Sequence, residues 1–327
     1  MTVHRFRSRR AAFAIIAAVA AACVPADAKS PENPIIRDQF VADPSAHAFG
    51  GRIYLYATND SGNDGKYWNG NDWRAFSSAD ARHWKDHGSF ASVNQFAWAK
   101  GLAWAPDAAS RNGTYYLIVP VDRTKIGVLK GKTPVGPWKD AIGAPLIDKM
   151  RDADAGAEPI DPAVFSDKGM TVLAFGTRVP KMVQLSDDLT RTIGPIRDLK
   201  IVGAPPSAPY GEAPWIHKRG SLYYFSYSTG WPGQIVYATS RHLFGPYTWR
   251  GVILDRMNTF TNHQSIVEFK GKWYIFYHNK SLPGGSDFRR SINVDRLYYR
   301  TDGTIMPVVP SGAGALPGLP AVENPAK

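Results

Sequence analysis

At residues 210–225 the chain reads YGEAPWIHKRGSLYYF, in which a glutamate precedes an Ala-Pro pair and a later glycine opens a run rich in aromatic residues. Glycine supplies the positive φ of a tight hairpin turn, and the aromatic run after it is typical of a strand. Four further segments share this frame of polar loop, glycine and apolar strand. The five frame glycines, 62, 56, 51 and 51 residues apart, are Gly51, Gly113, Gly169, Gly220 and Gly271.

The repeat predicts the fold. A unit of about 50 residues with roughly four strands has the size of a propeller blade, and five such units occupy residues 34 to about 310. The 30 glycines and 25 prolines, with few long helical patterns, also favour many turns and strands. The sequence therefore predicts an all-β fold, a five-bladed β-propeller, as one domain over residues 29–310.

The N-terminus has the pattern of a signal peptide at residues 1–28. A positive region of four arginines precedes the 13-residue apolar run Ala11–Cys23, which is too short to span a bilayer comfortably. Ala26-Asp27-Ala28 fits a cleavage site, so we expect an exported protein, periplasmic or extracellular. Two variants stay open: a weak lipoprotein-type box would make Cys23 a lipid anchor, and Ser8-Arg9-Arg10 weakly resembles a twin-arginine signal.

Composition excludes several function classes. Cys23 is the only cysteine, so a chain cleaved after residue 28 has no thiol for disulfides, catalysis or metal binding. The formal charge of +11 falls to +8 when residues 1–28, with four arginines and one aspartate, are removed. The remaining charges are scattered and indicate a solvated basic surface. We expect no nucleic-acid partner and no membrane contact beyond the anchor, while the oligomeric state stays open. The Gly/Pro/Ala-rich tail, residues 311–327, is expected to be disordered.

One position recurs in the repeat, eight residues before each frame glycine. It holds Asp43, Ala105, Asp161, Glu212 and His263. The innermost strands of a propeller face its central axis, so equivalent positions of different blades should converge there. Alone, an Asp-Pro pair is usually a turn signal and a histidine in an Asn-His-Gln loop is usually structural. Together they favour a functional cavity, because converging carboxylates repel one another and cost stability unless function requires them.

Three carboxyl groups in one pocket suit the hydrolysis of glycosides. One carboxylic acid protonates the leaving oxygen, and one carboxylate activates water or attacks the sugar. A third carboxylate nearby can raise the pKa of the acid and hold it in position. The spacing of the residues does not tell the acid from the base.

The motifs around these positions resemble glycoside hydrolase family 43 over nearly the whole mature chain. They read ADPSAH at 42–47, WAPD at 104–107, IDPAVF at 160–165, GEAPW at 211–215 and HQSI at 263–266. The resemblance implies a five-bladed catalytic propeller that inverts configuration and removes terminal xylose or arabinose from plant cell-wall polysaccharides or their oligosaccharides. Such an enzyme is a β-xylosidase, an α-L-arabinofuranosidase or both. The matching residues imply that Asp43 is the general base, Asp161 the pKa modulator and Glu212 the general acid.

Further roles follow from the resemblance and from residue type. No cofactor is required, but His263 would form the floor of the site beside a calcium ion in the central channel, which it would bind through water. Arg290 matches an arginine that reaches the substrate. The rings of Trp104 and Trp215 are expected to stack on sugar, although packing in the blade core is the alternative. Glu-Ala-Pro at Glu212 replaces the family's usual Glu-Gly-Pro.

Residues near the repeated position receive weaker assignments. Trp231 is a further candidate for sugar contact, and His278 is placed near the rim. Asp107 is expected to be structural, and Glu158 and Asp154 are expected to be solvated loop charges.

Inversion makes a geometric prediction, since the carboxyl groups of Asp43 and Glu212 should then lie roughly 6.5–9.5 Å apart. Three alternatives stay open: an endo- or exo-arabinanase of the same fold, a fructosidase-type hydrolase, and a non-catalytic carbohydrate-binding propeller. Fructosidases carry Arg-Asp-Pro and Glu-Cys where this chain has Ile160-Asp161-Pro162 and Glu212-Ala213. A binding module would be favoured by the loss of a carboxylate, and none is lost.

Overall fold

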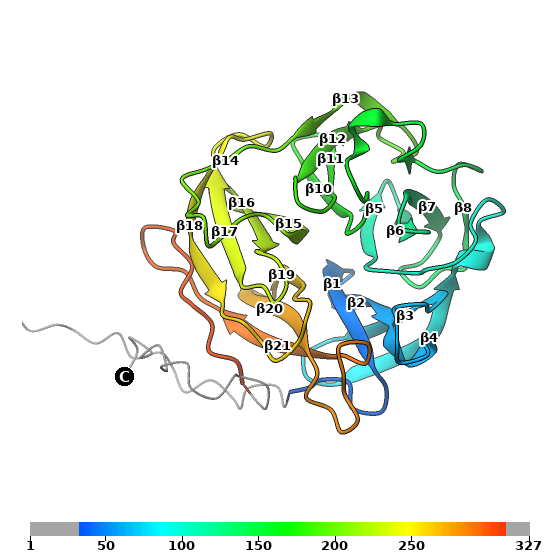
Figure 1. The fold of residues 1–327 in the computed structure, drawn as a ribbon, viewed down its shortest axis with the longest axis horizontal. Coiled ribbons are helices and arrows are strands. Elements are labelled where there is room, and N and C mark those ends of the chain that lie inside the picture. The colour runs from blue at the N-terminus through cyan, green and yellow to red at the C-terminus, as the bar shows by residue number, and fades with distance from the viewer. Residues whose placement is uncertain (1–32, 312–327) are drawn as a thin grey trace, which may run out of the picture.

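The computed structural model describes residues 33–311 and confirms the five-bladed β-propeller (Figure 1). The helical segments within this range are three-residue 3₁₀ turns, namely η1 (Asp60–Gly62), η2 (Val93–Gln95) and η3 (Ala153–Ala155). Over the same range no helix is long and apolar enough to cross a membrane. The predicted signal peptide with Cys23, and the tail beyond residue 311, lie outside the described residues.

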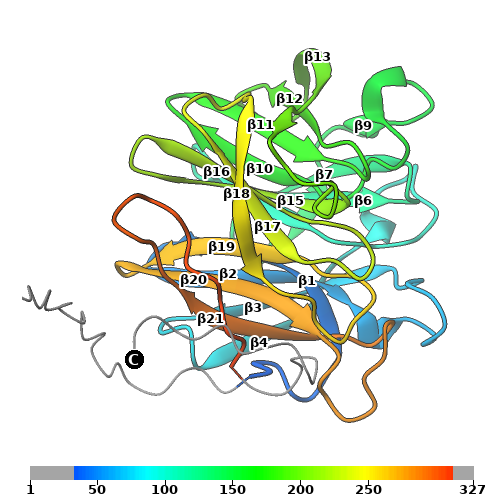
Figure 2. The ribbon, with the colours of Figure 1, turned by 60° about the vertical axis from the view of Figure 1, so that its left-hand side comes forward.

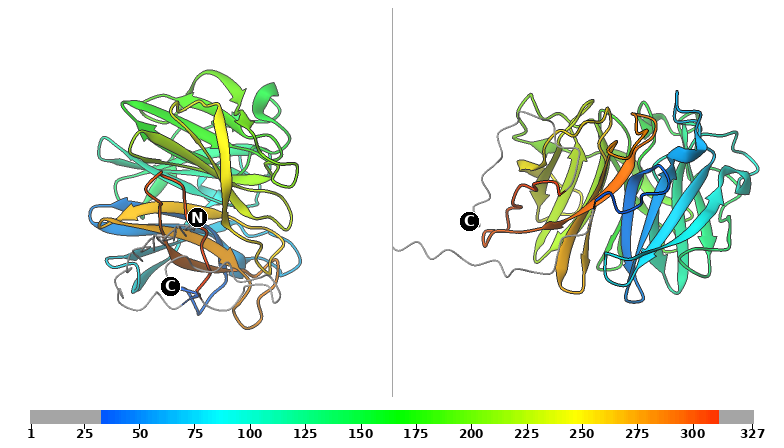
Figure 3. Two further views of the ribbon diagram at one scale, coloured as in Figure 1. Left: turned by 90° about the vertical axis from the view of Figure 1, so that its left-hand side faces the viewer. Right: turned by 90° about the horizontal axis from the view of Figure 1, so that it is seen from below.

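Each blade is an antiparallel sheet whose first strand is nearest the axis, and the strands run along that axis (Figures 1 and 3). The first blade contains β1 (Val41–Phe49), β2 (Arg52–Asn59), β3 (Asp72–Ser78) and β4 (Trp84–Ser92). The second contains β5 (Asp107–Arg111), β6 (Thr114–Val121), β7 (Lys125–Gly131), β8 (Trp138–Asp140) and β9 (Ile147–Asp148). The third contains β10 (Ala163–Asp167), β11 (Met170–Phe175), β12 (Lys181–Leu185) and β13 (Thr192–Asp198).

Like the second blade, in which β9 pairs with β7, the last two blades depart from four simple strands. The fourth contains β15 (Glu212–Arg219), β16 (Leu222–Ser228), β17 (Ile235–Ser240) and β18 (Tyr247–Leu254), with the short β14 (Ile201–Val202) added in parallel to β18. The fifth contains three strands, β19 (Gln264–Phe269), β20 (Lys272–Asn279) and β21 (Ser291–Leu297). Five hydrophobic clusters fill the spaces between neighbouring blades, one at each blade interface. The ring is therefore held together by packing between blades as well as by the sheets.

The N-terminal segment closes the ring on the fifth blade. The Ile35 amide donates to the Ile292 carbonyl over 2.9 Å. The side chain of Asn33 pairs with the backbone of β21 as a neighbouring strand would. Its Nδ2 donates to the Val294 carbonyl (3.1 Å), and its Oδ1 accepts from the Val294 amide (2.9 Å). Figure 2 shows β1 beside β19 and β20, on which it packs. The first and last blades are thus joined without a fourth strand of the usual length.

The frame glycines lie in the hairpins between the first two strands of each blade, but not all at the same turn position. Phe49 pairs with Arg52, so Gly51 is the second residue of its two-residue turn. Arg219 pairs with Leu222, so Gly220 is the first residue of its turn. The fourth blade is therefore shifted by one residue relative to the glycine count.

This shift corrects the position assigned to Glu212. Asp43 and Asp161 both have left-handed backbones, with φ of 52° and 55°, and in the fourth blade the equivalent residue is Ala213, with φ of 58°. β-Bulges between Ala42 and Ser45 and between Glu212 and Trp215 place Asp43 and Ala213 at matching points. Glu212 thus precedes the repeated position by one residue.

Candidate active site

A cavity of about 250 Å³ lies at the starts of the inner strands, where all five blades meet. Of the residues predicted for the site, it brings together Asp43, Asp161, Glu212, His263, Trp104, Trp231 and Arg290. The other lining residues are Tyr67, Trp68, Ala105, Arg123, Glu158, Ile160, Phe260 and Thr261. Glu212 reaches the pocket despite its shifted register.

Asp43 is held in its ionised form. The Arg290 guanidinium donates to both carboxylate oxygens, over 2.8 and 3.1 Å, and the Thr58 hydroxyl donates to Oδ2 over 2.7 Å. Burial is the largest single influence and would raise the pKa of Asp43, but Arg290, His278 and His263 together outweigh burial, and the pKa lies well below the usual carboxyl range. A buried carboxylate that stays ionised can accept a proton from water.

His278 fixes the backbone of Asp43. Its Nε2 lies 3.0 Å from the Thr261 carbonyl, to which it donates, and its Nδ1 lies 3.3 Å from Asp43 Oδ1. That nitrogen lies 3.2 Å from the Asp43 amide, whose N–H it accepts. The left-handed conformation of Asp43 is thereby stabilised from the last blade.

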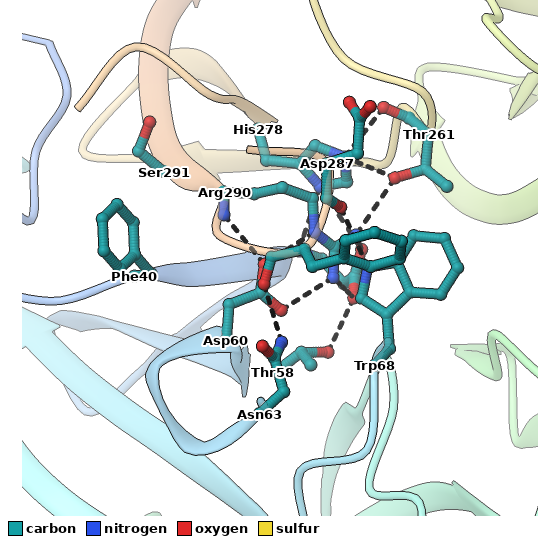
Figure 4. Close-up of polar contacts among 12 residues, drawn as sticks. Phe40, Thr58, Asp60, Asn63, Trp68, Thr261, His278, Asp287, Arg290 and Ser291 are labelled. Atoms are coloured by element: carbon teal, nitrogen blue, oxygen red, sulfur yellow. Dashed lines mark hydrogen bonds and ion pairs between the residues drawn. The ribbon is translucent and has the colours of Figure 1, made fainter. Parts of the chain in front are cut away.

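Arg290 uses all five of its N–H donors within the protein (Figure 4). Two go to Asp43, one goes to Thr261 Oγ1 (3.1 Å), and two go to Asp60, from Nε over 2.7 Å and from Nη2 over 2.9 Å. The contact of Arg290 with substrate stays a prediction, because all five donors of this guanidinium are engaged within the protein and one bond would have to be exchanged for a bond to a sugar. In this structure Arg290 positions the carboxylate of Asp43.

Asp60 is a residue of the site that sequence reasoning missed. It is fully buried and accepts three bonds from Arg290, including one from the backbone amide over 2.9 Å. Burial raises the pKa of Asp60 even though Arg290 opposes the shift. Asp60 follows β2, outside the repeated position, so the glycine count gave no signal for it.

Glu212 and Asp161 are both held toward the protonated form. Burial, then the negative charges of Asp161 and Asp43, raise the pKa of Glu212 well above the usual carboxyl range. Burial and Asp43 raise the pKa of Asp161 to about 8. The Ala213 amide donates to Asp161 Oδ2 over 3.0 Å, which favours the ionised form of that group. Of the two groups, Glu212 therefore holds its proton the more firmly at neutral pH.

His263 stands between the two aspartates as a neutral imidazole. Its Nδ1 lies 3.8 Å from Asp43 Oδ1 and 4.0 Å from Asp161 Oδ2. Burial outweighs these carboxylates and lowers the pKa of His263 to about 4. A neutral ring at the floor of the pocket can orient water or sugar hydroxyls without adding charge.

The described residues do not fit direct coordination of a metal ion. Over residues 33–311 no three histidine, cysteine, aspartate or glutamate side chains are grouped so as to hold one. Asp107, the carboxylate deeper in the ring, is already occupied, since it accepts from Ser45 Oγ, from His47 Nε2 and from the Val164 amide, each over 2.6 Å. It joins three blades, as expected for a structural residue.

The two predicted sugar-stacking tryptophans lie in different places. Trp104 lines the pocket, and its Nε1 donates to the Trp68 carbonyl over 2.6 Å. Trp215 is only 6% exposed, donates to the Ile266 carbonyl (2.9 Å) and packs against His47. It lines a separate cavity toward the other end of the inner strands. The prediction for Trp215 is corrected, because the strand carries it past the pocket and into the blade interface.

The rim of the pocket carries two arginine–tryptophan pairs, Arg123 with Trp104 and Arg178 with Trp231. The Arg123 guanidinium lies 5.4 Å from the ring centre of Trp104, and it forms an ion pair with Glu158 and a 3.0 Å hydrogen bond to the Tyr67 hydroxyl. Glu158 is therefore a paired residue of the pocket wall, rather than the solvated loop charge that was expected. These contacts join loops of the first three blades across one side of the opening.

Comparison with known proteins supports one family. The sequence model of glycosyl hydrolases family 43 matches residues 31–305. Xylosidase/arabinosidase 43A of Humicola insolens is 32% identical, over 84% of this chain and 98% of that protein. A xylosidase/arabinosidase of Bacteroides ovatus is 31% identical, over 86% and 98%.

Solved structures agree with these relatives. CoXyl43, a β-xylosidase/α-arabinofuranosidase from a compost metagenome solved with xylotriose, superposes with a TM-score of 0.77 at 35% identity, covering 85% of this chain and 97% of that one. A Xanthomonas citri enzyme solved with xylose gives a TM-score of 0.78 at 33% identity, over 87% and 94%.

Proposed function

Because the chain belongs to glycosyl hydrolase family 43, we propose that it is an exo-acting, inverting hydrolase that removes terminal xylose or arabinose from plant cell-wall glycans. The activity would be that of a β-xylosidase, an α-L-arabinofuranosidase or both. One observation carries the proposal: a single pocket holds an ionised carboxylate, Asp43, and a carboxyl group kept protonated, Glu212. Two such groups held in opposite protonation states are what acid–base hydrolysis of a glycoside requires.

The reaction follows from these two states. Asp43 accepts a proton from water as the water oxygen attacks the anomeric carbon. Glu212 gives its proton to the glycosidic oxygen as the carbon–oxygen bond breaks, so the leaving group departs as an alcohol. The sugar is released with inverted configuration, and solvent returns both carboxyl groups to their starting states. Arg290 orients Asp43, and burial together with the neighbouring carboxyl groups maintains the raised pKa of Glu212.

The size and rim of the pocket favour action at a chain end. A cavity of about 250 Å³ is smaller than the roughly 300–1,000 Å³ of drug-sized ligand sites and suits a single sugar. The bridge of Tyr67, Arg123 and Glu158 obstructs one side, where an internal position of a polymer would have to pass. An endo-arabinanase is therefore not favoured, and a non-catalytic propeller is not favoured because all three carboxyl groups are present.

A proton NMR time course on xylo- and arabino-oligosaccharides tests the proposal. We expect release of single terminal sugars, with α-xylose as the first anomer from a β-linked substrate. A first product with retained configuration would remove the assignment of Asp43 as base. Nitrophenyl β-xyloside and α-arabinofuranoside, assayed with the wild type and Asp43→Ala, separate the two sugar specificities. Sugar binding without turnover of any glycoside would support the binding module instead.

Two finer parts of the proposal concern the export of the protein and a calcium ion in the central channel. We propose cleavage after Ala28, which mass spectrometry of the mature N-terminus would reveal; an intact N-terminus or a lipid on Cys23 would contradict it. We also propose that any calcium in the central channel is held through water by His263, since no direct ligand set is present among residues 33–311. Unfolding measured with a chelator and with added calcium should then differ by a few degrees, and equal midpoints would argue against an ion.

A further inference from the structure

The second arginine–tryptophan pair of the rim lies beside the proposed acid. Trp231 lines the same pocket as Glu212 and is 37% exposed. The Arg178 guanidinium lies 5.7 Å from the centre of its ring. An exposed indole next to a proton donor offers an apolar surface where the departing part of a substrate would lie, and the guanidinium adds a positive charge there.

The backbone fixes Arg178 relative to Glu212. The Arg178 amide donates to the Gly211 carbonyl over 2.7 Å, directly before the glutamate in the chain. The Tyr210 hydroxyl donates to the Gly176 carbonyl over 2.7 Å, which ties the same turn to the start of β15. Arg178 itself has a left-handed φ of 66°, a conformation that persists only where the surroundings enforce it. The backbone position from which the Arg178 side chain reaches Trp231 is therefore built into the fold.

Arg178 differs from the neighbouring cations in having no carboxylate partner within residues 33–311. Arg123 is paired with Glu158, Arg290 with Asp43 and Asp60, and Lys280 with Asp287 over 3.0 Å. Arg123 and Arg178 are otherwise alike, since each follows the second strand of its blade and lies over a tryptophan. Because the adjacent Glu212 is held protonated, an incoming anion would not meet a fixed negative charge beside Arg178.

We propose that Arg178 and Trp231 form a leaving-group subsite for an acidic sugar, in which the guanidinium binds a uronate carboxylate and the indole contacts the sugar ring. The planar guanidinium suits two parallel hydrogen bonds to a carboxylate. The substrate class is a xylo-oligosaccharide whose second sugar carries a uronic acid. This inference rests on the proposed function, because the leaving group lies beside Glu212 only if Glu212 is the acid.

The test compares xylobiose with xylobiose that carries glucuronic acid on its reducing-end sugar. The ratio of kcat/KM values, acidic over neutral, should fall about five-fold in Arg178→Gln, the size expected for one exposed charge pair. Arg178→Lys should keep part of the preference, since it retains the charge but not the two-pronged geometry. The matched control is Arg197→Gln, because Arg197 is also exposed and lies 6.0 Å from the ring of Phe244, an aromatic residue that, unlike Trp231, does not line the pocket. It should leave the ratio unchanged.

Binding measured without turnover separates this inference from the proposed function. Calorimetric Kd values for the same two sugars, taken in Asp43→Asn protein with and without Arg178→Gln, should show the same loss of preference. The preference should also shrink as salt is raised from about 0.05 M to 1 M, because exposed charges are screened. A ratio that is equal in wild type and Arg178→Gln overturns the inference. No hydrolysis of either sugar by wild type overturns the proposed function, and the Kd values still decide whether Arg178 binds the uronate.

Discussion

Asp43→Asn and Glu212→Gln make the same chemical change in the same pocket, yet they should have very unequal consequences for stability. Asp43 is ionised and accepts two hydrogen bonds from Arg290, over 2.8 and 3.1 Å, and a third from Thr58 over 2.7 Å. Its amide variant leaves a buried guanidinium short of negative charge. Glu212 is already neutral in the folded state, so an amide in its place removes no charge.

The structure sets the expected sizes. Breaking a buried ion pair costs about 3–5 kcal/mol; Arg290 keeps Asp60 as a partner, so we expect the lower end, about 3 kcal/mol. At roughly 2–4 °C per kcal/mol for a chain of this size, Tm should fall by about 6–12 °C. Glu212→Gln should change the free energy of unfolding by less than about 1 kcal/mol, as usual for substitutions that create no cavity or unpaired charge.

Differential scanning calorimetry at neutral pH measures both variants against the wild type. Thr58→Val serves as a control, because it removes one hydrogen bond to the Asp43 carboxylate but leaves the ion pair with Arg290 in place, and it should cost about 1.5–3 kcal/mol. Equal losses of Tm in the two amide variants, or a larger loss for Glu212→Gln, would refute the assigned protonation states. The same result would remove the physical basis for naming Asp43 the base and Glu212 the acid.

Three further predictions concern the pocket. Glu212→Gln should lower kcat on xylobiose by about 10²–10⁴-fold, because the general acid is lost, and should spare activated aryl glycosides far more; equal loss on both, in parallel assays, would contradict the role. The raised pKa values of Asp161 and Glu212 favour the protonated folded state. The contribution of these two groups to the free energy of unfolding should therefore be fully present below about pH 4, and it should be lost as pH rises through about 8, the pKa of Asp161. Tm measured against pH should fall less steeply in Glu212→Gln, and a rise of Tm over this range would contradict the raised pKa values. Trp104→Ala should raise KM for oligosaccharides by about ten-fold, as expected for the loss of about 1–1.5 kcal/mol of ring contact, whereas Trp215→Phe should lower Tm and leave KM unchanged; initial rates and calorimetry of both variants would show whether this division is wrong.

Much of the fold could be predicted from the sequence because its repeat is marked by turn chemistry. Each frame glycine lies in a hairpin, and the count from it located Asp43 and Asp161 at matching left-handed positions. The count failed by one residue at Glu212, since Gly220 opens its turn where the other glycines close theirs. That difference depends on which turn residue adopts the positive φ. Because a shift of one residue leaves the hydrophobic pattern of the strands unchanged, the pattern gives no sign of it.

The environment of the carboxyl groups was less predictable. Asp60 lies outside the repeated position, and its role depends on the reach of the Arg290 side chain from the fifth blade. The stacking expected of Trp215 failed for a similar reason, because the β-bulge after Glu212 alters the alternation of inward- and outward-facing residues. Contacts between blades join residues far apart in sequence, and no local pattern encodes them.

The contact between Asn33 and the end of the described chain has a topological consequence. Asn33 Nδ2 donates to the Ser311 carbonyl over 2.9 Å, so residues from the two ends touch beside the fifth blade. A short linker should therefore be able to join them, and the chain could be opened at another exposed loop as a circular permutant. The cyclic order of the blades would be preserved while the order of base and acid along the polypeptide changed. In such a ring, catalysis depends on where each blade lies around the axis, and it does not depend on which blade is translated first.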